Sequence, residues 1–289
     1  MRFVLRPGRV LAACAVLILI GTATACASAG SADPASAEGR GSVTVFAASS
    51  LTDVVDTLNS AYAGGGRLRV NVGSSSQLVA QIQSGARADV VITADPEALE
   101  PLRAEVDREA ALATNRLVLA LAPENPAGIE VLRDVSAAGV RTVLCAPAVP
   151  CGRAAGKVLE AEGLELAAPS LEDNVRSVLT KVSSGQADAG FVYRTDALAA
   201  AGSGVTFLPL PGGEPNTYPA ALTVDGAGNS AAVAFYEWLT GPEAAGILRE
   251  AGFVPENGSE PGNGSESENG SGAPAEGNRE HGRGADHVG

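Results

Sequence analysis

Two serine-containing junctions hold the residues of this sequence best suited to chemistry. Ser50 follows the largely apolar segment 43–48, and Ser75 lies in the polar junction that follows the segment 68–72. Both serines stand close to segments with apolar residues at helical spacing, so each hydroxyl is expected near the start of a helix. A hydrogen bond from such a hydroxyl to a charged acceptor is worth about 1.5 to 3 kcal/mol. A lone serine of this kind is usually an N-cap, but serines at two junctions favour anion capture.

The distribution of histidine excludes several kinds of catalysis. The two histidines, His281 and His287, lie near the C-terminus, and the segment 42–255 contains none. Ser-His pairs, Cys-His pairs and histidine-held metals are therefore absent from the expected folded body. A secreted serine hydrolase with Lys157 or Lys181 as its base is a weaker alternative, because neither lysine has the Ser-x-x-Lys spacing to the serines. We expect no enzymatic activity, no resident metal and no cofactor.

Strands and helices are expected to alternate along the chain. The pattern predicts strands at 43–48, 68–72, 89–93, 140–145 and 190–193, and helices at 51–62, 77–84, 153–162 and 170–183. Such alternation implies mainly parallel α/β sheets, whose ligands bind beyond the carboxyl ends of the strands. Ser50 and Asp53 also have the spacing of a capping box at the first of these helices.

Converging helix N-termini would suit a small dianion. Each N-terminus presents unpaired N–H groups and about half a positive charge, so four of them would supply about two units. An oxyanion without a proton, such as molybdate, tungstate or sulfate, needs donors alone, whereas monohydrogen phosphate also needs an acceptor. Arg153, Arg176 and Arg194 lie beside the junctions and could steer or compensate the anion, but surface ion pairs are the preferred interpretation.

The charge balance excludes a nucleic-acid partner. The chain has 33 acidic and 20 basic residues and a net charge of −13. Arg2, Arg6 and Arg9 lie in a segment expected to be removed, which would leave 17 basic residues and a net charge of −16. Binding to nucleic acid through counterion release is therefore not expected.

The N-terminus has the layout of a secretory signal. The first nine residues carry three arginines, the next eleven are apolar and five small residues follow. The apolar run is too short to cross a membrane, which takes about 20 residues. The small residues before Cys26 resemble a bacterial lipobox, so 1–25 is predicted to be a lipoprotein-type signal peptide and Cys26 to carry the lipid. Cys14 offers a second, less suitable match, and cleavage without lipidation stays an alternative.

Two further segments are not expected to fold. Residues 26–41 consist mostly of alanine, serine, glycine, aspartate and proline, which is typical of a flexible tether to the outer face of the cell membrane. Residues 256–289 are rich in glycine, serine, asparagine and glutamate. Such an acidic tail buries too little apolar surface to offset its ordering entropy, so we expect it to be disordered.

The segments between these ends resemble the molybdate-binding component of bacterial ABC transporters. The resemblance runs in one order from about residue 42 to residue 253. It rests on the motifs VTVFAASSLTDVV (43–55), GSSSQLVAQI (73–82), GARADVVI (85–92), DNVRSVL (173–179) and ADAGFVYRTD (187–196). It implies an exported monomer, periplasmic or lipid-anchored, that captures molybdate and tungstate and delivers them to a membrane permease. Sulfate, phosphate or another small oxyanion is the nearest alternative ligand.

Carried over position by position, the resemblance implies six oxyanion ligands. They are the backbones of Ala48, Cys151 and Val175 and the hydroxyls of Ser50, Ser75 and Tyr193. Many members of the family have alanine in place of Cys151. Because the contact expected there uses the amide N–H, the change of side chain should leave it intact.

The resemblance also implies a type II periplasmic binding protein fold. In this fold two α/β lobes are joined by two crossover strands and hold the ligand in the cleft between them. Lobe I is expected to comprise 42–120 and 221–255, and lobe II 121–220. The crossings are placed near 115–122 and 218–225. The effector domain of a transcription regulator would share this fold but should lack an export signal.

The cysteines of the expected folded body are predicted to pair. Loss of Cys14 with the signal and lipidation of Cys26 would leave Cys145 and Cys151 in an exported, oxidising environment. A disulfide that closes a loop of about seven residues contributes roughly 2 to 3 kcal/mol on the chain-entropy model. Two small buried thiols are the alternative.

Overall fold

The computed structural model describes residues 41–64 and 66–256. The predicted signal peptide, Cys26 with its lipid, the tether except Gly41, and the tail beyond Glu256 lie outside the described residues. Within the described part of the chain, no helix is long and apolar enough to cross a membrane.

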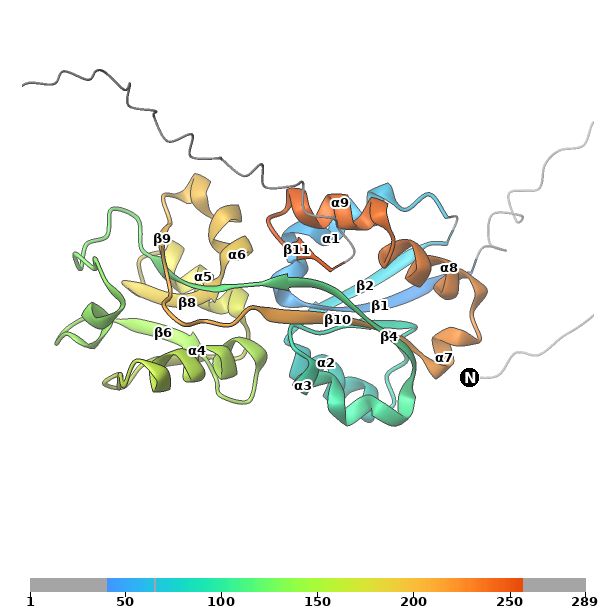
Figure 1. Ribbon diagram of the computed structural model, residues 1–289, viewed down its shortest axis with the longest axis horizontal. Helices are drawn as coiled ribbons and strands as arrows, with labels where there is room; N and C mark the ends of the chain where they lie inside the picture. The colour runs from blue at the N-terminus through green and yellow to red at the C-terminus, as the bar shows by residue number, and fades with distance from the viewer. Residues whose placement is uncertain (1–40, 65, 257–289) are drawn as a thin grey trace, which may run out of the picture. The chain divides into compact units, whose positions relative to one another are not determined.

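One six-stranded sheet forms the first of two α/β lobes, called lobe I (Figure 1). Its strand order is β11-β4-β10-β3-β1-β2. The strands are β1 (Val43–Ala48), β2 (Leu68–Gly73), β3 (Val90–Ile92), β4 (Val106–Asn115), β10 (Asn216–Thr223) and β11 (Val254–Pro255). Strand β1 runs parallel to β2 and β3, while β10 runs antiparallel to β3 and β4.

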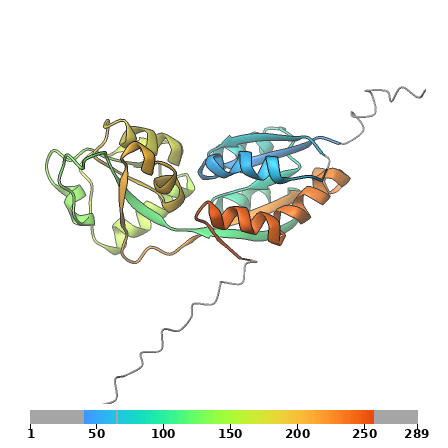
Figure 2. The ribbon, with the colours of Figure 1, turned by 90° about the horizontal axis from the view of Figure 1, so that it is seen from above.

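Helices cover both faces of this sheet (Figures 1 and 2). Their bounds are α1 (Thr52–Ala61), α2 (Ser75–Gln83), α3 (Pro96–Leu99), α7 (Val224–Ala227), α8 (Ser230–Leu239) and α9 (Pro242–Glu250). Because side chains alternate along a strand, Val45 and Ala47 of β1 join the buried cluster of Leu58 on α1. Phe46 belongs to a separate cluster with Leu78 of α2. The sheet is therefore buried on both faces, as parallel strands require.

A five-stranded sheet of order β7-β6-β8-β5-β9 forms lobe II. Its strands are β5 (Leu117–Leu121), β6 (Thr142–Cys145), β7 (Ser170–Glu172), β8 (Ala189–Tyr193) and β9 (Thr206–Pro209), and its helices are α4 (Pro150–Ala161), α5 (Val175–Ser183) and α6 (Arg194–Ala199). Strand β6 is parallel to β7 and β8, whereas β5 is antiparallel to β8 and β9.

The first change of lobe falls within the predicted range 115–122, whereas the second crossing and both predicted lobe boundaries differ from the structure. It leaves lobe I after Asn115 and enters lobe II at Leu117, so only Arg116 lies between the two sheets. It returns through 210–215 to β10. The predicted boundaries at 120/121 and 220/221 instead fall inside β5 and β10, because these apolar segments pair their backbones within a sheet. The sequence shows their burial but not which partner strands they have.

The expected helix at 170–183 is wrong in its first five residues. Residues 170–172 form the edge strand β7 beside β6, and the helix begins only at Val175, after the N-cap Asn174. The side chain of Asn174 accepts a hydrogen bond from the Ser177 amide at 3.0 Å, which fixes this start.

Gly152 in the first turn of α4 gives a prediction about the β6–α4 junction. A Cβ atom at this position would lie 1.9 Å from the carbonyl oxygen of Ala146. Gly152→Ala should therefore force the junction apart and cost about 1 to 3 kcal/mol. At roughly 2 to 4 °C per kcal/mol for a domain of this size, thermal unfolding would detect the change.

Gly156→Ala in the same helix is the matched control. A Cβ atom there meets nothing within 4 Å, and alanine has the higher helix propensity, so stability should be unchanged or slightly raised. Equal melting temperatures for the two variants would contradict the close approach at Gly152.

Candidate functional site

A small cavity lies where strands of both lobes end. Its volume is about 10 Å³, room for roughly one water-sized group before the walls must move. All six predicted ligand residues line it: Ala48, Ser50, Ser75, Cys151, Val175 and Tyr193. It is also lined by Ser49, Ser74, Ala94, Val149, Pro150 and Asn174, which sequence reasoning did not single out.

The hydroxyl oxygen of Ser50 already accepts a hydrogen bond from the protein. The side chain is buried, and Tyr218 on β10 donates its phenolic hydrogen to Ser50 Oγ at 2.8 Å. The hydrogen of Ser50 itself is not used by this bond and can be donated into the cavity. The expected capping box is wrong, because neither the 3-10 turn Ser49–Leu51 nor α1 has a side-chain cap, and Asp53 pairs with Arg176 instead.

Ser75 and Tyr193 repeat this arrangement. The backbone amide of Ala94 donates to Ser75 Oγ at 3.0 Å, and Asn216 Nδ2 donates to Tyr193 Oη at 3.0 Å. Burial raises the pKa of the Tyr193 hydroxyl well above its ordinary value, so the group keeps its proton. Three hydroxyls from two lobes thus accept one bond each from the protein and retain one hydrogen each to donate.

Helix ends add backbone donors to the cavity. Ser75 and Val175 are the first residues of α2 and α5, and Cys151 is the second residue of α4. Amides in a first helical turn have no acceptor within the helix. Each end also carries about half a positive charge. Among the described residues that line the cavity, none is acidic, basic or histidine, so no lining side chain carries charge and the helix ends contribute positive potential.

A disulfide joins Cys145 at the end of β6 to Cys151 at the start of α4. The sequence predicts this pair. The intervening residues 146–150 form the junction that carries the Cys151 amide to the cavity. Both half-cystines are buried. A cross-link and the close approach at Gly152 therefore hold the same turn.

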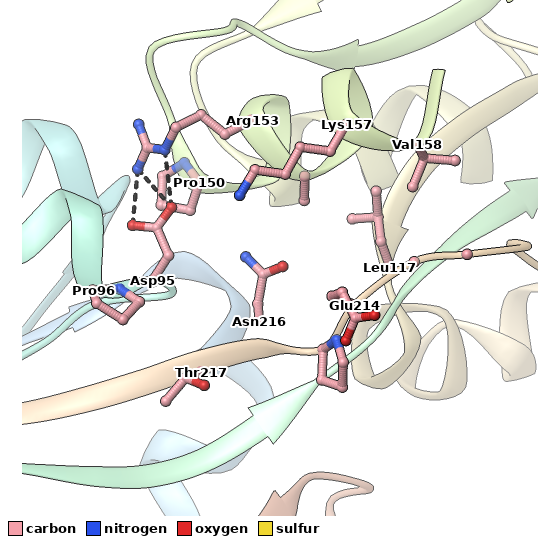
Figure 3. A pocket seen from close by; sticks show the side chains of 14 residues that line it. Asp95, Pro96, Leu117, Pro150, Arg153, Lys157, Val158, Glu214, Asn216 and Thr217 are labelled. Atoms are coloured by element: carbon pink, nitrogen blue, oxygen red, sulfur yellow. Dashed lines mark hydrogen bonds and ion pairs between the residues drawn. The ribbon is translucent and has the colours of Figure 1, made fainter. Parts of the chain in front are cut away.

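Arg153 and Asp95 form an ion pair across the lobes (Figure 3). Arg153 lies on α4 of lobe II, and its guanidinium donates to both carboxylate oxygens of Asp95 in lobe I at 2.6 to 3.0 Å. The two side chains are only 16% and 13% exposed. The pair borders a pocket of about 230 Å³ next to the cavity, which Asn216 and Lys157 also line.

Arg176 makes a second bridge of this kind. It lies beside Val175 in lobe II and pairs with Asp53 of α1 in lobe I at 2.6 Å and with Asp196 at 3.5 Å. Both arginines therefore form ion pairs, as predicted, but the pairs are largely or partly buried and connect the lobes. Arg194 instead reaches the Gly252 carbonyl at 3.5 Å. None of the three lines the cavity.

Asp196 is a buried carboxyl directly behind Tyr193. It is fully buried and accepts a hydrogen bond from the Tyr193 amide at 3.2 Å. Burial raises its pKa to about 7, although the nearby Arg176 guanidinium opposes this shift. The group therefore titrates near neutral pH.

Residues 43–254 match the family model described as bacterial extracellular solute-binding protein. The chain belongs to this family. The match covers both lobes and all residues of the cavity, so the resemblance inferred from the motifs is confirmed.

Two relatives of this solute-binding protein are molybdate-binding proteins ModA. The protein of Mycobacterium tuberculosis H37Rv is 36% identical over 206 residues, which cover 67% of this chain and 78% of the relative. That of Escherichia coli K12 is 31% identical over 226 residues, covering 72% and 87%. These relatives are solute-binding proteins rather than enzymes.

Solved structures confirm the two-lobed periplasmic binding protein fold. The periplasmic molybdate-binding protein of Azotobacter vinelandii superimposes with a TM-score of 0.64 at 26% identity, covering 73% of this chain and 98% of that chain. The sulfate-binding protein SubI of Mycobacterium tuberculosis gives 0.63 at 18% identity, covering 75% and 88%, and this likeness shows the fold alone.

Removal of the Asp95 carboxylate is expected to loosen the contact between the lobes. Asp95→Asn deprives Arg153 of its nearer anionic partner and leaves it only the longer contact with Glu97 at 3.4 Å. The asparagine keeps an oxygen that can cap α3, as Asp95 does for Ala98 at 2.8 Å. The closed arrangement should lose about 1 to 3 kcal/mol. Small-angle scattering without added anion should then show a larger radius of gyration.

Glu100→Gln is the control for this experiment. Glu100 pairs with Arg103 inside lobe I, and both side chains are more than half exposed. The radius should stay at the wild-type value in this variant. The same value in Asp95→Asn would contradict a role of the ion pair in closure.

Asp196 predicts a specific pH dependence of stability. Because its pKa is raised from 3.8 to about 7 in the folded protein, the folded state binds this proton more tightly than the unfolded state. Its contribution to stability is present below pH 4 and is lost as the pH rises to about 7. Asp196→Asn should thus gain stability relative to wild type between pH 5 and pH 8 in urea unfolding.

Asp188→Asn provides the comparison. The Arg141 guanidinium lowers the pKa of Asp188, so this carboxyl is ionised throughout that range in both states. The difference in unfolding free energy from wild type should be the same at pH 5 and pH 8. A constant difference for Asp196→Asn as well would show that Asp196 does not titrate there.

Proposed function

We propose that this protein captures molybdate and tungstate outside the cytoplasm and delivers them to the permease of an ABC transporter. The observation that carries the proposal is the set of three buried hydroxyls whose oxygens are occupied by protein donors. Such hydroxyls offer hydrogens to a ligand, which must supply acceptors. A small oxyanion without a proton meets this demand at every oxygen.

The neutral character of the cavity supports the same ligand class. Helices α2, α4 and α5 together provide about one and a half positive units at their N-termini, and the turn leading into α1 adds further amides. This approaches the charge of a dianion without any cationic side chain. Monohydrogen phosphate is disfavoured, because it would bring a hydrogen into a site built from donors.

The choice of molybdate over sulfate rests on the relatives. The two relatives at 36% and 31% identity are named as molybdate-binding proteins. The predicted ligand set suits either oxyanion: the amides of Ala48, Cys151 and Val175 with the hydroxyls of Ser50, Ser75 and Tyr193. We assign these groups to the oxyanion and assign the protein no covalent chemistry.

Capture is expected to stabilise the closed arrangement of the lobes. Ser50 and Ser75 belong to lobe I, while Cys151, Val175 and Tyr193 belong to lobe II. An anion held by both lobes shifts the equilibrium toward closure by its difference in affinity for the two states. The closed monomer would then dock on the permease. Cys26, with its lipid, would keep it at the outer face of the membrane.

Titration calorimetry with four anions tests the proposal. Molybdate and tungstate should bind the full exported chain far more tightly than sulfate, and phosphate should bind most weakly. Tight binding of sulfate or phosphate with no response to molybdate would assign the protein to another anion. No binding of any of the four would refute anion capture.

Two substitutions test the assigned donors. Tyr193→Phe and Ser50→Ala each remove one hydrogen bond to a charged acceptor, worth about 1.5 to 3 kcal/mol, so affinity should fall roughly 10- to 150-fold. Tyr193→Phe is the cleaner variant, because Asn216 keeps its bond to the Ala94 carbonyl at 3.2 Å. Ser50→Ala also leaves Tyr218 without this acceptor and should lower stability.

Tyr62→Phe is the matched control for the loss of a phenolic hydroxyl. Tyr62 packs in lobe I against Phe235 and Trp238 and does not line the cavity. The affinity of Tyr62→Phe for molybdate should equal that of wild type. Wild-type affinity in Tyr193→Phe and Ser50→Ala as well would remove these hydroxyls from the site.

A further inference from the structure

The hydroxyl of Ser74 is buried at the cavity without a hydrogen-bond partner. Within the described residues, three buried side-chain polar atoms have no hydrogen-bond partner: Tyr62 Oη, Ser74 Oγ and Trp238 Nε1. Tyr62 and Trp238 pack against each other, with ring centroids 5.2 Å apart, and neither lines the cavity. Ser74 does line it, beside Ser75, and its side chain is 3% exposed.

Helix capping does not account for this hydroxyl. Ser74 is the N-cap of α2, where a serine normally accepts a hydrogen bond from an amide of the first turn. No such bond is present at Ser74. Asn174, the N-cap of α5 at the same cavity, does make it, to the Ser177 amide. Ser74 thus occupies a capping position with its side chain uncommitted.

A buried hydroxyl without a partner costs free energy, and such groups in folded proteins call for a specific reason. Position supplies one here. Ser74 joins β2 to the nine-residue helix α2, and both Ser74 and Ser75, the first residue of this helix, line the cavity. A charged acceptor in the cavity would satisfy the hydroxyl and the N-terminal amides of α2 together.

We propose that Ser74 is a direct ligand of the bound anion, a fourth hydroxyl donor beside Ser50, Ser75 and Tyr193. This inference rests on the proposed function, since it concerns the same cavity. Before capture, the unpartnered hydroxyl costs the protein free energy. In the bound state, its hydrogen bond to the anion recovers this free energy. Ser74 then acts in binding alone, whereas Ser75 also holds the Ala94 amide in place.

Ser74→Ala distinguishes an anion ligand from a helix cap by two measurements, the melting temperature and the affinity for molybdate. Substitution of a ligand hydroxyl that has no protein partner should leave the melting temperature of the anion-free chain unchanged or raise it. The dissociation constant for molybdate should rise tenfold or more. A lower melting temperature with unchanged affinity would overturn the proposal and make Ser74 an ordinary cap, and unchanged values of both would overturn it as well.

Ser84→Ala is the control from the same helix. Its exposed hydroxyl, just past the C-terminal end of α2, donates to the Ala80 carbonyl at 2.8 Å, far along the helix from the cavity. It should bind molybdate like wild type. The full exported chain is used for all three proteins, with calorimetry for affinity and differential scanning for stability.

Failure of the proposed function would give a different result from failure of the Ser74 proposal. If wild type binds sulfate or phosphate in place of molybdate, the assignment of molybdate is wrong, and Ser74→Ala is judged with the anion that wild type binds. A tenfold loss for that anion would still support Ser74 as a ligand. If wild type binds none of molybdate, tungstate, sulfate and phosphate, both proposals are refuted.

Discussion

The orientation of three hydroxyl groups is the constraint on which the architecture of the site depends. A hydroxyl can donate or accept, and an uncommitted one would suit a protonated and an unprotonated ligand alike. Here Tyr218, the Ala94 amide and Asn216 each occupy one oxygen, which leaves the hydrogens for the cavity. Two of these three donors lie on β10, the strand by which the chain re-enters lobe I. The antiparallel position of β10 beside β3 therefore contributes to the polarity of the site as well as to the sheet.

The charged side chains lie at the contacts between the lobes and not in the lining of the cavity. The chain as a whole is acidic, with a net charge of −13, which would repel a polyanion. A small desolvated anion responds mainly to the nearest dipoles, and three helix ends provide them. The arginines closest to the cavity are neutralised by Asp95 and Asp53 of the opposite lobe. They hold the lobes together and leave the cavity to neutral donors.

Much of the site could be predicted from the sequence because its residues stand at the ends of local elements. The apolar run before Ser50 and the junction around Ser75 identify strand ends, and the family resemblance adds Cys151, Val175 and Tyr193. The hydrogen-bond donors behind these residues could not be predicted, since Tyr218 is 168 positions from Ser50. The lobe boundaries and the second crossing differ from the prediction for the same reason: burial of β5 and β10 is visible in the sequence, but strand pairing over long separations is not. Ser74 could not be predicted, because only the structure shows that its buried hydroxyl has no hydrogen-bond partner.

The disulfide between Cys145 and Cys151 has a consequence for the thermodynamics of capture. It spans the turn that presents the Cys151 amide, and it exists whether or not an anion is bound. The conformational entropy of this turn is therefore lost when the protein folds and oxidises, not when the ligand arrives. Association needs to order only what remains mobile between the lobes. The cross-link can thus strengthen binding through entropy without touching the anion, and its contribution would be invisible in any map of contacts.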